Sequence, residues 1–254
     1  SRPALGGDDH PSAVTAGEPD QPFTPSQPMF GFPAPAAQWT ALFEGPHNAA
    51  ALRLAKRPED WAMPVLCITG PAKSGLSFLA EAWVSHFGGA FLSAAHLGRA
   101  ARRGLDEYGS AHVAVDDADI AASRHEEALL TLINIIGAGG GRLLLTSHRA
   151  PSQWRTGSAD LRSRLNALPV GEISGPDEDV LRARLSIAAE RRFLKLAPET
   201  LTYLVPRLEL AYEAVEDFMD RLSASVSDAD RAPSLPLARS VLDAMREPDG
   251  DDEG

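Results

Sequence analysis

The residues most suited to chemistry lie in one short segment, Gly70–Ser77, which reads Gly-Pro-Ala-Lys-Ser-Gly-Leu-Ser. The apolar run Val65–Thr69 comes directly before it, and the amphipathic stretch Gly75–His86 overlaps its end. A strand, a glycine-rich turn and a helix are therefore predicted in that order. This order matches the phosphate-binding frame G-x-x-x-x-G-K-[ST], which points to a nucleotide polyphosphate as ligand.

Each retained position of the frame has a physical role. Gly70, Ser74 and Gly75 belong to the turn whose backbone N–H groups surround a phosphate at the start of the helix. The hydroxyl group of Ser77 would hold the magnesium ion. The frame is broken at Leu76, which stands where a lysine neutralises the β- and γ-phosphates. An ordinary glycine-rich turn is the alternative, and a working nucleotide site is a separate question from an ancestral one.

Two later strand ends carry polar residues suited to the same chemistry. The run His112–Val115 leads into Asp116 and Asp117, where the first acid would orient Mg²⁺ and the second would polarise a water molecule. His148 follows the run Arg142–Ser147, and we predict that it senses the terminal phosphate. A hydrogen-bonded loop histidine without that role is the alternative.

A pair of arginines lies further along the chain, in the segment Ser158–Leu165. Arg162 and Arg164 are two residues apart, so they face different sides of a helix. Arg164 is the candidate arginine finger, which would reach the nucleotide of a neighbouring subunit. For Arg162 we expect a surface salt bridge.

Apolar runs alternate with helical patterns up to residue 173, and only helical patterns follow. Strands that are apolar throughout and separated by helices predict a parallel sheet covered on both faces. The expected fold class is an α/β three-layer domain with a five-stranded parallel sheet, followed by a small all-helical domain. The expected strands are Val65–Thr69, Ala90–Ser93, His112–Val115, Arg142–Ser147 and Val170–Ile173; the expected helices are Gly75–His86, Ala94–Arg103, Arg124–Gly137, Pro176–Arg192, Ala197–Arg207, Glu209–Ser225 and Leu235–Arg246.

Composition sets the domain limits and excludes several classes of protein. The chain of 254 residues has 24 basic and 35 acidic residues, and the acidic excess excludes a strongly basic DNA-coating protein. Much of the excess comes from two tails, since residues 1–37 hold one base and four acids and residues 248–254 hold four acids and no base. We expect a proline-rich tail over 1–37, an α/β domain over 38–174, a helical domain over 175–247 and an acidic tail over 248–254. The chain has a single cysteine, Cys67, which lies in an apolar run, so an intramolecular disulfide is excluded. No apolar run is long enough to span a membrane, and a cytoplasmic protein is therefore expected.

The order of these motifs resembles that of the AAA+ ATPases, and more narrowly that of the Hda family, the DnaA-related regulators that inactivate the bacterial replication initiator. The closest likeness is to the alphaproteobacterial type, over about residues 40–246. The residues that carry it are Phe43–Asn48, Asp60–Trp61, Ile68–Pro71, Val113–Asp119, Leu144, Thr146–Ser147, Asp160–Leu165, Pro176–Glu178, Tyr203–Leu204 and Pro236–Arg239.

The resemblance implies negative regulation of DNA replication initiation. The protein would bind the ATP-bound DnaA-type initiator and promote hydrolysis of that ATP, with Arg164 entering the initiator's nucleotide site. It would do so while bound to the DNA polymerase sliding clamp through a short glutamine motif, for which Gln27, Met29, Phe30 and Phe32 are the candidates. Direct sequence-specific DNA binding is not expected, and a homodimer stays open.

Two departures from the family pattern affect the chain's own nucleotide site. Leu76 replaces the lysine of the Walker A motif, and the segment Glu209–Asp220, where the family has a lid arginine, contains no basic residue. We therefore expect no cofactor, or ADP or ATP with Mg²⁺ bound weakly, in a protein that does not itself turn over ATP. An active P-loop ATPase and an inert AAA+ adaptor are the alternatives.

Overall fold

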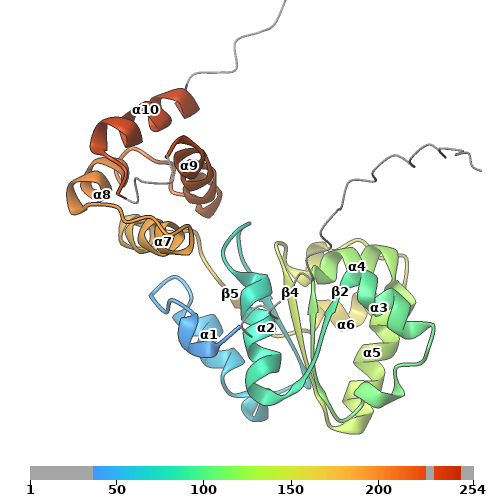
Figure 1. The fold of residues 1–254 in the computed structure, drawn as a ribbon. Coiled ribbons are helices and arrows are strands. Elements are labelled where there is room, and N and C mark those ends of the chain that lie inside the picture. The colour runs from blue at the N-terminus through green and yellow to red at the C-terminus, as the bar shows by residue number, and fades with distance from the viewer. Residues whose placement is uncertain (1–36, 227–231, 247–254) are drawn as a thin grey trace, which may run out of the picture. The chain divides into compact units, whose positions relative to one another are not determined.

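The computed structural model describes residues 37–226 and 232–246, and its centre is a parallel sheet in the strand order β2-β3-β4-β1-β5 (Figure 1). The strands are β1 Val65–Thr69, β2 Gly89–Ser93, β3 His112–Asp116, β4 Arg142–Ser147 and β5 Val170–Glu172. Every neighbouring pair runs parallel. The prediction of a five-stranded parallel sheet is confirmed.

The strand order brings the predicted site residues to one edge of the sheet. β1 pairs with β4, so that Thr69 lies opposite Ser147, and β3 pairs with the other side of β4. Parallel strands all end at the same edge, which is where ligands bind in open α/β sheets. The loop after β1, Asp116 at the end of β3, and His148 just after β4 therefore open on that edge.

Side chains alternate along the strands, and each face of the sheet has its own buried core. On one face Val65, Cys67 and their neighbours pack with residues of α3, α4, α5 and α6. On the other face Leu66 and Ile68 pack with residues of α1 and α2 (Figure 1). These helices are α1 Ala49–Ala55, α2 Leu76–Phe87, α3 Ala94–Ala101, α4 Ala118–Arg124, α5 Glu126–Gly139 and α6 Ala159–Asn166, with single 3-10 turns at Trp39–Ala41, Pro58–Asp60, Asp106–Tyr108 and Pro151–Gln153.

Cys67 is fully buried in β1. Burial raises the pKa of its thiol far above the ordinary value, so the thiolate does not form near neutral pH. Cys67 therefore packs as a small apolar side chain, as its sequence context predicts.

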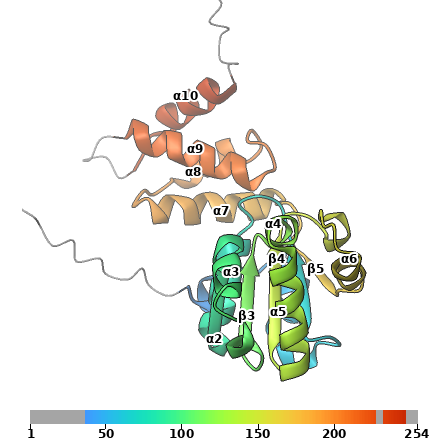
Figure 2. The same ribbon diagram turned by 90° about the vertical axis from the view of Figure 1, so that its right-hand side faces the viewer.

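Four further helices follow the sheet and pack around a core of their own. They are α7 Glu178–Arg191, α8 Pro198–Leu204, α9 Tyr212–Ser225 and α10 Leu235–Arg246. α7 lies beside α9, and α10 packs against α8 and α9 (Figure 2). Their shared core includes the fully buried side chains of Phe218 and Met219. The predicted helical segment after the sheet is thus observed, and none of the helices in the described ranges is long and apolar enough to cross a membrane.

Several helices differ from the expectation; α8, for example, ends at Leu204 rather than Arg207, and α9 begins at Tyr212 rather than Glu209. The helices α1 and α4 were not predicted, because both are short and are built largely from alanine, whose small side chain gives little apolar periodicity. α7 begins at Glu178 rather than Pro176, because the Asp177 side chain caps the helix by accepting a hydrogen bond of 2.8 Å from the Val180 N–H.

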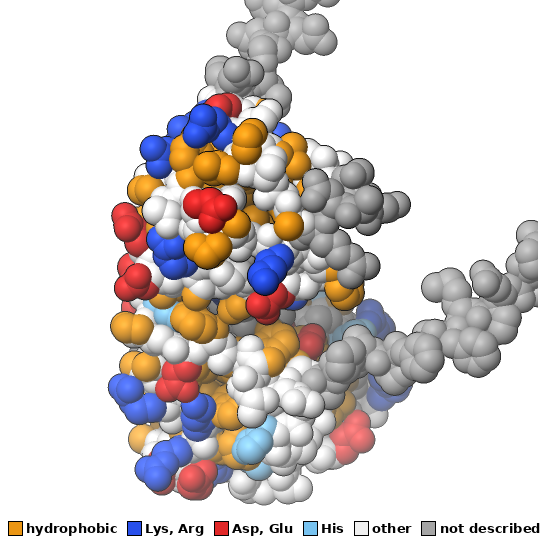
Figure 3. All heavy atoms as spheres, turned by 60° about the vertical axis from the view of Figure 1, so that its left-hand side comes forward, with side chains coloured by type: hydrophobic (Ala, Val, Ile, Leu, Met, Phe, Trp, Pro, Cys, Tyr) orange, Lys and Arg blue, Asp and Glu red, His pale blue; other side chains and the backbone are white. Residues whose placement is uncertain are grey.

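The surface of the described residues carries both signs of charge. On the face drawn in Figure 3, acidic and basic side chains alternate among apolar and neutral ones. This mixture agrees with a sequence in which much of the acidic excess lies in residues 1–37 and 248–254.

Candidate nucleotide site and exposed arginine

The loop between β1 and α2 has the backbone conformation of an anion-binding turn. Lys73 has φ 60° and Gly75 has φ 101°, so two left-handed residues alternate with Ser74 between them. Such alternation turns successive N–H groups toward one point. Gly75 is also the N-cap of α2 and offers no side-chain acceptor, so the first N–H groups of a 12-residue helix are available to an anion.

The side chains around the loop restrict position 70 to glycine. Ser74 is buried, and its hydroxyl has no hydrogen-bond partner. A Cβ atom added at Gly70 would lie 2.8 Å from that hydroxyl oxygen and 3.0 Å from Ile173, so only glycine fits there. Ser77 is exposed in the first turn of α2. Gly70, Ser74 and Gly75 thus lie in the loop between β1 and α2, and Ser77 follows in the first turn of α2.

The cation that the loop would need is missing from its expected place. Leu76 is 4% exposed and packs in the core between α2 and the sheet, with Leu79 and Leu52. Lys73, the loop's own lysine, is exposed.

The two acids at the end of β3 have different environments. Asp116 is 9% exposed, and its Oδ1 accepts a hydrogen bond of 2.6 Å from the hydroxyl of Thr146 on β4. Asp117 has φ 51° and is the N-cap of α4. Burial, followed by the charges of Asp116 and Asp119, raises the pKa of Asp117. Asp116 is therefore the better-fixed candidate for a magnesium ligand.

His148 contacts the phosphate loop directly. Its Nδ1 lies 3.0 Å from the carbonyl oxygen of Gly70, so the ring donates to the loop backbone from that nitrogen and leaves the other for a further partner. The predicted sensor position is therefore beside the loop. Its role toward phosphate stays a prediction.

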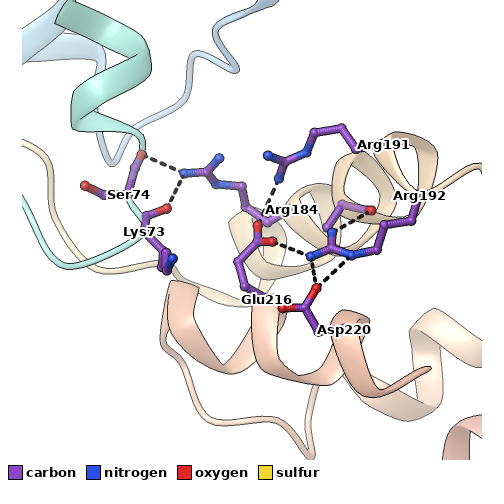
Figure 4. Close-up of polar contacts among 8 residues, drawn as sticks. Lys73, Ser74, Arg184, Arg191, Arg192, Glu216 and Asp220 are labelled. Atoms are coloured by element: carbon purple, nitrogen blue, oxygen red, sulfur yellow. Dashed lines mark hydrogen bonds and ion pairs between the residues drawn. The ribbon is translucent and has the colours of Figure 1, made fainter. Parts of the chain in front are cut away.

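A second arginine, which the sequence analysis did not single out, reaches the loop from α7. The Nη2 atom of Arg184 donates hydrogen bonds to the carbonyl oxygens of Ser74 at 2.6 Å and Lys73 at 3.2 Å (Figure 4). Its guanidinium lies over the ring of Tyr212, 4.8 Å from the ring centre. Burial lowers the pKa of Arg184, and its Nε has no hydrogen-bond partner. A sequence signal existed, because Arg184 falls four residues after the buried Val180 and so lies in the apolar stripe of α7.

The surroundings of Arg184 include a second buried group that sequence reasoning missed. His47 is 8% exposed, stacks on Phe43, and has no partner at Nδ1. Burial and the nearby charge of Arg184 lower the pKa of His47, although Asp177 opposes this effect. His47 and Tyr212 face each other with ring centres 6.4 Å apart.

The acidic helix α9 binds arginines instead of supplying one. Arg192 donates to Glu216 at 2.8 Å and also pairs with Asp220, and Arg191 donates to Glu216 at 2.9 Å (Figure 4). Burial alone would raise the pKa of Glu216, but these arginines lower it. The absence of a basic residue over Glu209–Asp220 thus leaves a carboxylate-lined helix that holds α7.

These residues fit a magnesium polyphosphate only in part. The N–H groups of the loop, the hydroxyl of Ser77 and the carboxylate of Asp116 suit phosphate and Mg²⁺. The loop lacks a cation that would neutralise the phosphate charge. The buried Leu76 stands in the place of the lysine, and Arg184 donates to carbonyl oxygens of the loop. Within the described residues, no group of three or more His, Cys, Asp or Glu side chains could hold a metal ion.

The two arginines of α6 have different surroundings, as their spacing predicts. The Nη2 atom of Arg162 donates to the carbonyl oxygen of Thr156 at 2.6 Å, so this side chain fixes the preceding loop and does not form the expected salt bridge. The Arg164 side chain is 45% exposed and reaches only Asp160, at 4.0 Å. Arg164 is therefore the more available of the two cations.

The loop before α6 is held by one carboxylate from α5. Glu126 Oε2 accepts hydrogen bonds from the Thr156 hydroxyl at 2.7 Å, from the Gly157 N–H at 2.8 Å and from the Ser158 N–H at 3.2 Å. Ser158 in turn caps α6 by accepting from the N–H of Leu161. The start of the helix that carries the candidate finger is thus fixed. The remaining predicted residues, Gln27, Met29, Phe30 and Phe32, lie outside the described residues.

No family model matches the sequence. The fold is similar to that of domain III of the replication initiation protein DnaA from Thermotoga maritima, with a TM-score of 0.68 and 17% identity over 85% of this chain and 99% of that one. It is also similar to DnaA from Aquifex aeolicus, solved with bound AMPPCP, with a TM-score of 0.58 and 17% identity over 74% of this chain and 65% of that one. The Holliday junction branch migration motor RuvB from Thermotoga maritima matches with a TM-score of 0.55 and 16% identity, over 77% of this chain and 66% of that one. The chain therefore has the AAA+ fold that domain III of DnaA also has.

Proposed function

We propose that this protein regulates bacterial replication initiation by acting on an ATP-bound initiator of the DnaA type. In this proposal the protein is an Hda-like negative regulator in the cytoplasm, and its Arg164 reaches the nucleotide bound to the initiator. The observation that carries it is the contrast between an exposed arginine on α6 and a phosphate loop of its own that lacks a neutralising lysine.

Similarity to DnaA supports the choice of partner. A DnaA structure contains AMPPCP, so that protein binds an ATP analogue, and AAA+ domains of the same fold can meet through equivalent surfaces. An arginine that enters a partner's nucleotide site stabilises the charge that develops in phosphoryl transfer. In this proposal the hydrolysed ATP belongs to the initiator, and this chain's site stays degenerate.

The test measures hydrolysis by ATP-loaded initiator in the presence of DNA-loaded sliding clamp. We expect the wild-type protein to accelerate it and Arg164→Ala to lose that acceleration by about 10³-fold, the lower range for an arginine finger. Arg155→Ala is the matched control, because Arg155 is also exposed and lies in the loop before α6. Wild-type protein without effect, or Arg164→Ala as active as Arg155→Ala, would refute the proposal.

Clamp tethering is a separate part of the proposal. Gln27→Ala combined with Phe30→Ala should weaken capture of the protein by DNA-loaded clamp while leaving Arg164-dependent stimulation intact at high protein concentration. Equal capture of this variant and the wild type would remove residues 27–32 as the tether.

Calorimetry with ATP and Mg²⁺ separates the proposal from an active P-loop ATPase. The retained N–H groups of the loop, Ser77 and Asp116 are the features that favour the ATPase. Tight, magnesium-dependent binding followed by turnover would support it over the regulator with a degenerate site. An inert adaptor would bind the clamp or initiator and change no hydrolysis rate.

A further inference from the structure

Arg184 is an unusual residue for the face of α7 on which it lies. It falls between the buried residues Val180 and Ala188 at four-residue spacings, on the same face of the helix. A charged side chain in such a stripe loses water on folding and requires compensating partners. The partners of Arg184 therefore indicate what it does.

The partners of the guanidinium are backbone oxygens and an aromatic ring. Nη2 donates to the carbonyl groups of Ser74 and Lys73, and the Tyr212 ring lies beneath the cation. No carboxylate within the described ranges comes close enough to form an ion pair with Arg184. By contrast, Arg192 on the same helix is paired with two acids of α9 (Figure 4). Arg184 is thus committed to the loop, whereas Arg192 is committed to the bundle.

The side of the loop that Arg184 contacts follows from peptide geometry. In a trans peptide the N–H and the C=O point in opposite directions, so a loop whose N–H groups converge presents its carbonyl groups outward. A guanidinium bound to the carbonyls of Lys73 and Ser74 lies on that outer side. It also lies 3.6 Å from where a Cβ atom of Gly75 would be, directly against the last turn of the loop.

We propose that Arg184 is a latch that holds α7 against the outer side of the phosphate loop. The contact positions the loop, and it does so through carbonyl groups that a phosphate would not use. In this proposal a side chain of the chain itself holds the C-terminal helices against the loop. The Tyr212 hydroxyl also donates to the carbonyl oxygen of Ser174, in the segment between β5 and α7, at 3.1 Å.

This inference goes beyond the proposed function and does not depend on Arg164. It concerns how the chain's own loop is held, and its test involves neither an initiator nor a clamp. A failure of the latch leaves the arginine-finger test unchanged, and the reverse also holds.

The test compares Arg184→Met with Arg182→Met by amide hydrogen exchange of the full chain without nucleotide. Arg184→Met keeps an unbranched apolar stem but loses the donors, whereas Arg182 lies on the same helix and its side chain makes no hydrogen bond with the loop. We expect exchange over residues 70–77 and the start of α7 to become at least about tenfold faster in Arg184→Met, since a hydrogen bond from a charged donor is lost. Arg182→Met should exchange like the wild type.

Nucleotide binding supplies the second readout. If Arg184 is a latch that contacts only loop carbonyl groups, any loss of affinity in Arg184→Met is the same for fluorescent ADP and ATP analogues with Mg²⁺. Unchanged exchange in Arg184→Met would overturn the proposal. A tenfold or greater loss of affinity that is confined to the ATP analogue would also overturn it, because Arg184 would then be a ligand of the terminal phosphate. If Arg184→Met does not fold, Arg184→Lys is used, which keeps the charge but cannot donate to two carbonyls with the same planar geometry.

Discussion

Removing one hydroxyl group at the end of β4 should destabilise the fold, whereas the same substitution in α8 should not. Thr146 and Thr200 are both buried, at 0% and 1% exposure. The Thr146 hydroxyl donates to Asp116 at 2.6 Å, whereas the Thr200 hydroxyl has no hydrogen-bond partner. Valine has the shape of threonine without the hydroxyl, so the two substitutions isolate the hydrogen bond.

The magnitudes follow from these contacts. Thr146→Val leaves Asp116 without this donor, and losing a hydrogen bond to a charged group costs about 1.5–3 kcal/mol. For a chain of this size a loss of about 2 kcal/mol lowers Tm by roughly 4–8 °C. Thr200→Val removes a buried hydroxyl that has no partner, so its effect should range from none to a gain of about 2 kcal/mol.

Urea denaturation of the wild type and both variants measures these differences. The m values should agree, so that changes in the midpoint report stability. If Thr146→Val is within about 0.5 kcal/mol of the wild type, the hydrogen bond to Asp116 does not contribute as argued. If Thr200→Val loses as much stability as Thr146→Val, hydrogen bonding does not decide the outcome at either site.

Three further predictions follow from other contacts. Burial and the charge of Arg184 lower the pKa of His47 below its ordinary value of 6.5, so the contribution of His47 to stability is present above that pH and is lost as the pH falls through the folded-state pKa. In urea unfolding at about pH 7.5 and about pH 5, His47→Gln should therefore lose less stability on acidification than the wild type does. An equal loss in the two proteins would contradict this prediction. Trp83→Phe removes the Nε1 donor that lies 2.9 Å from the buried carbonyl oxygen of Ala55, and should lower the free energy of unfolding by about 1–3 kcal/mol in chemical denaturation. A variant as stable as the wild type would show that the carbonyl group finds another donor. Glu126→Ala should speed amide exchange in the loop that precedes α6 more than Glu126→Gln, which keeps an acceptor. Exchange in Glu126→Ala equal to that of the wild type would remove the carboxylate as the support of that loop.

The sheet and the phosphate loop were predictable because their signals are local. Each strand is an apolar run that ends in a polar residue, and the glycines of the loop have fixed spacing. The helices α1 and α4 were not predicted, because alanine favours a helix without marking a buried face. Where such a helix begins is decided by packing against the sheet, as for Ala51, which is fully buried against β5.

The contact of Arg184 with the loop could not be predicted in the same way. Its partners are backbone carbonyl groups, which every residue has, so the loop sequence holds no complementary residue type to pair with an arginine on α7. Only its position in the apolar stripe marked Arg184 as unusual. The family resemblance predicts a lid arginine over Glu209–Asp220, which leads into α9, whereas the arginine that contacts the loop lies in α7.

The contacts that support Arg164 explain how, under the proposed function, a degenerate nucleotide site and an arginine finger can coexist in one chain. Arg162 bonds to Thr156, Glu126 holds the same loop, and Ser158 caps α6. These contacts all come from α5, α6 and the loop before α6, and none of them involves the segment Gly70–Ser77. Loss of the lysine at the phosphate loop therefore leaves the position of α6 unchanged. In the proposed mechanism the finger needs a fixed helix and an exposed guanidinium, and both are independent of whether this chain binds a nucleotide of its own.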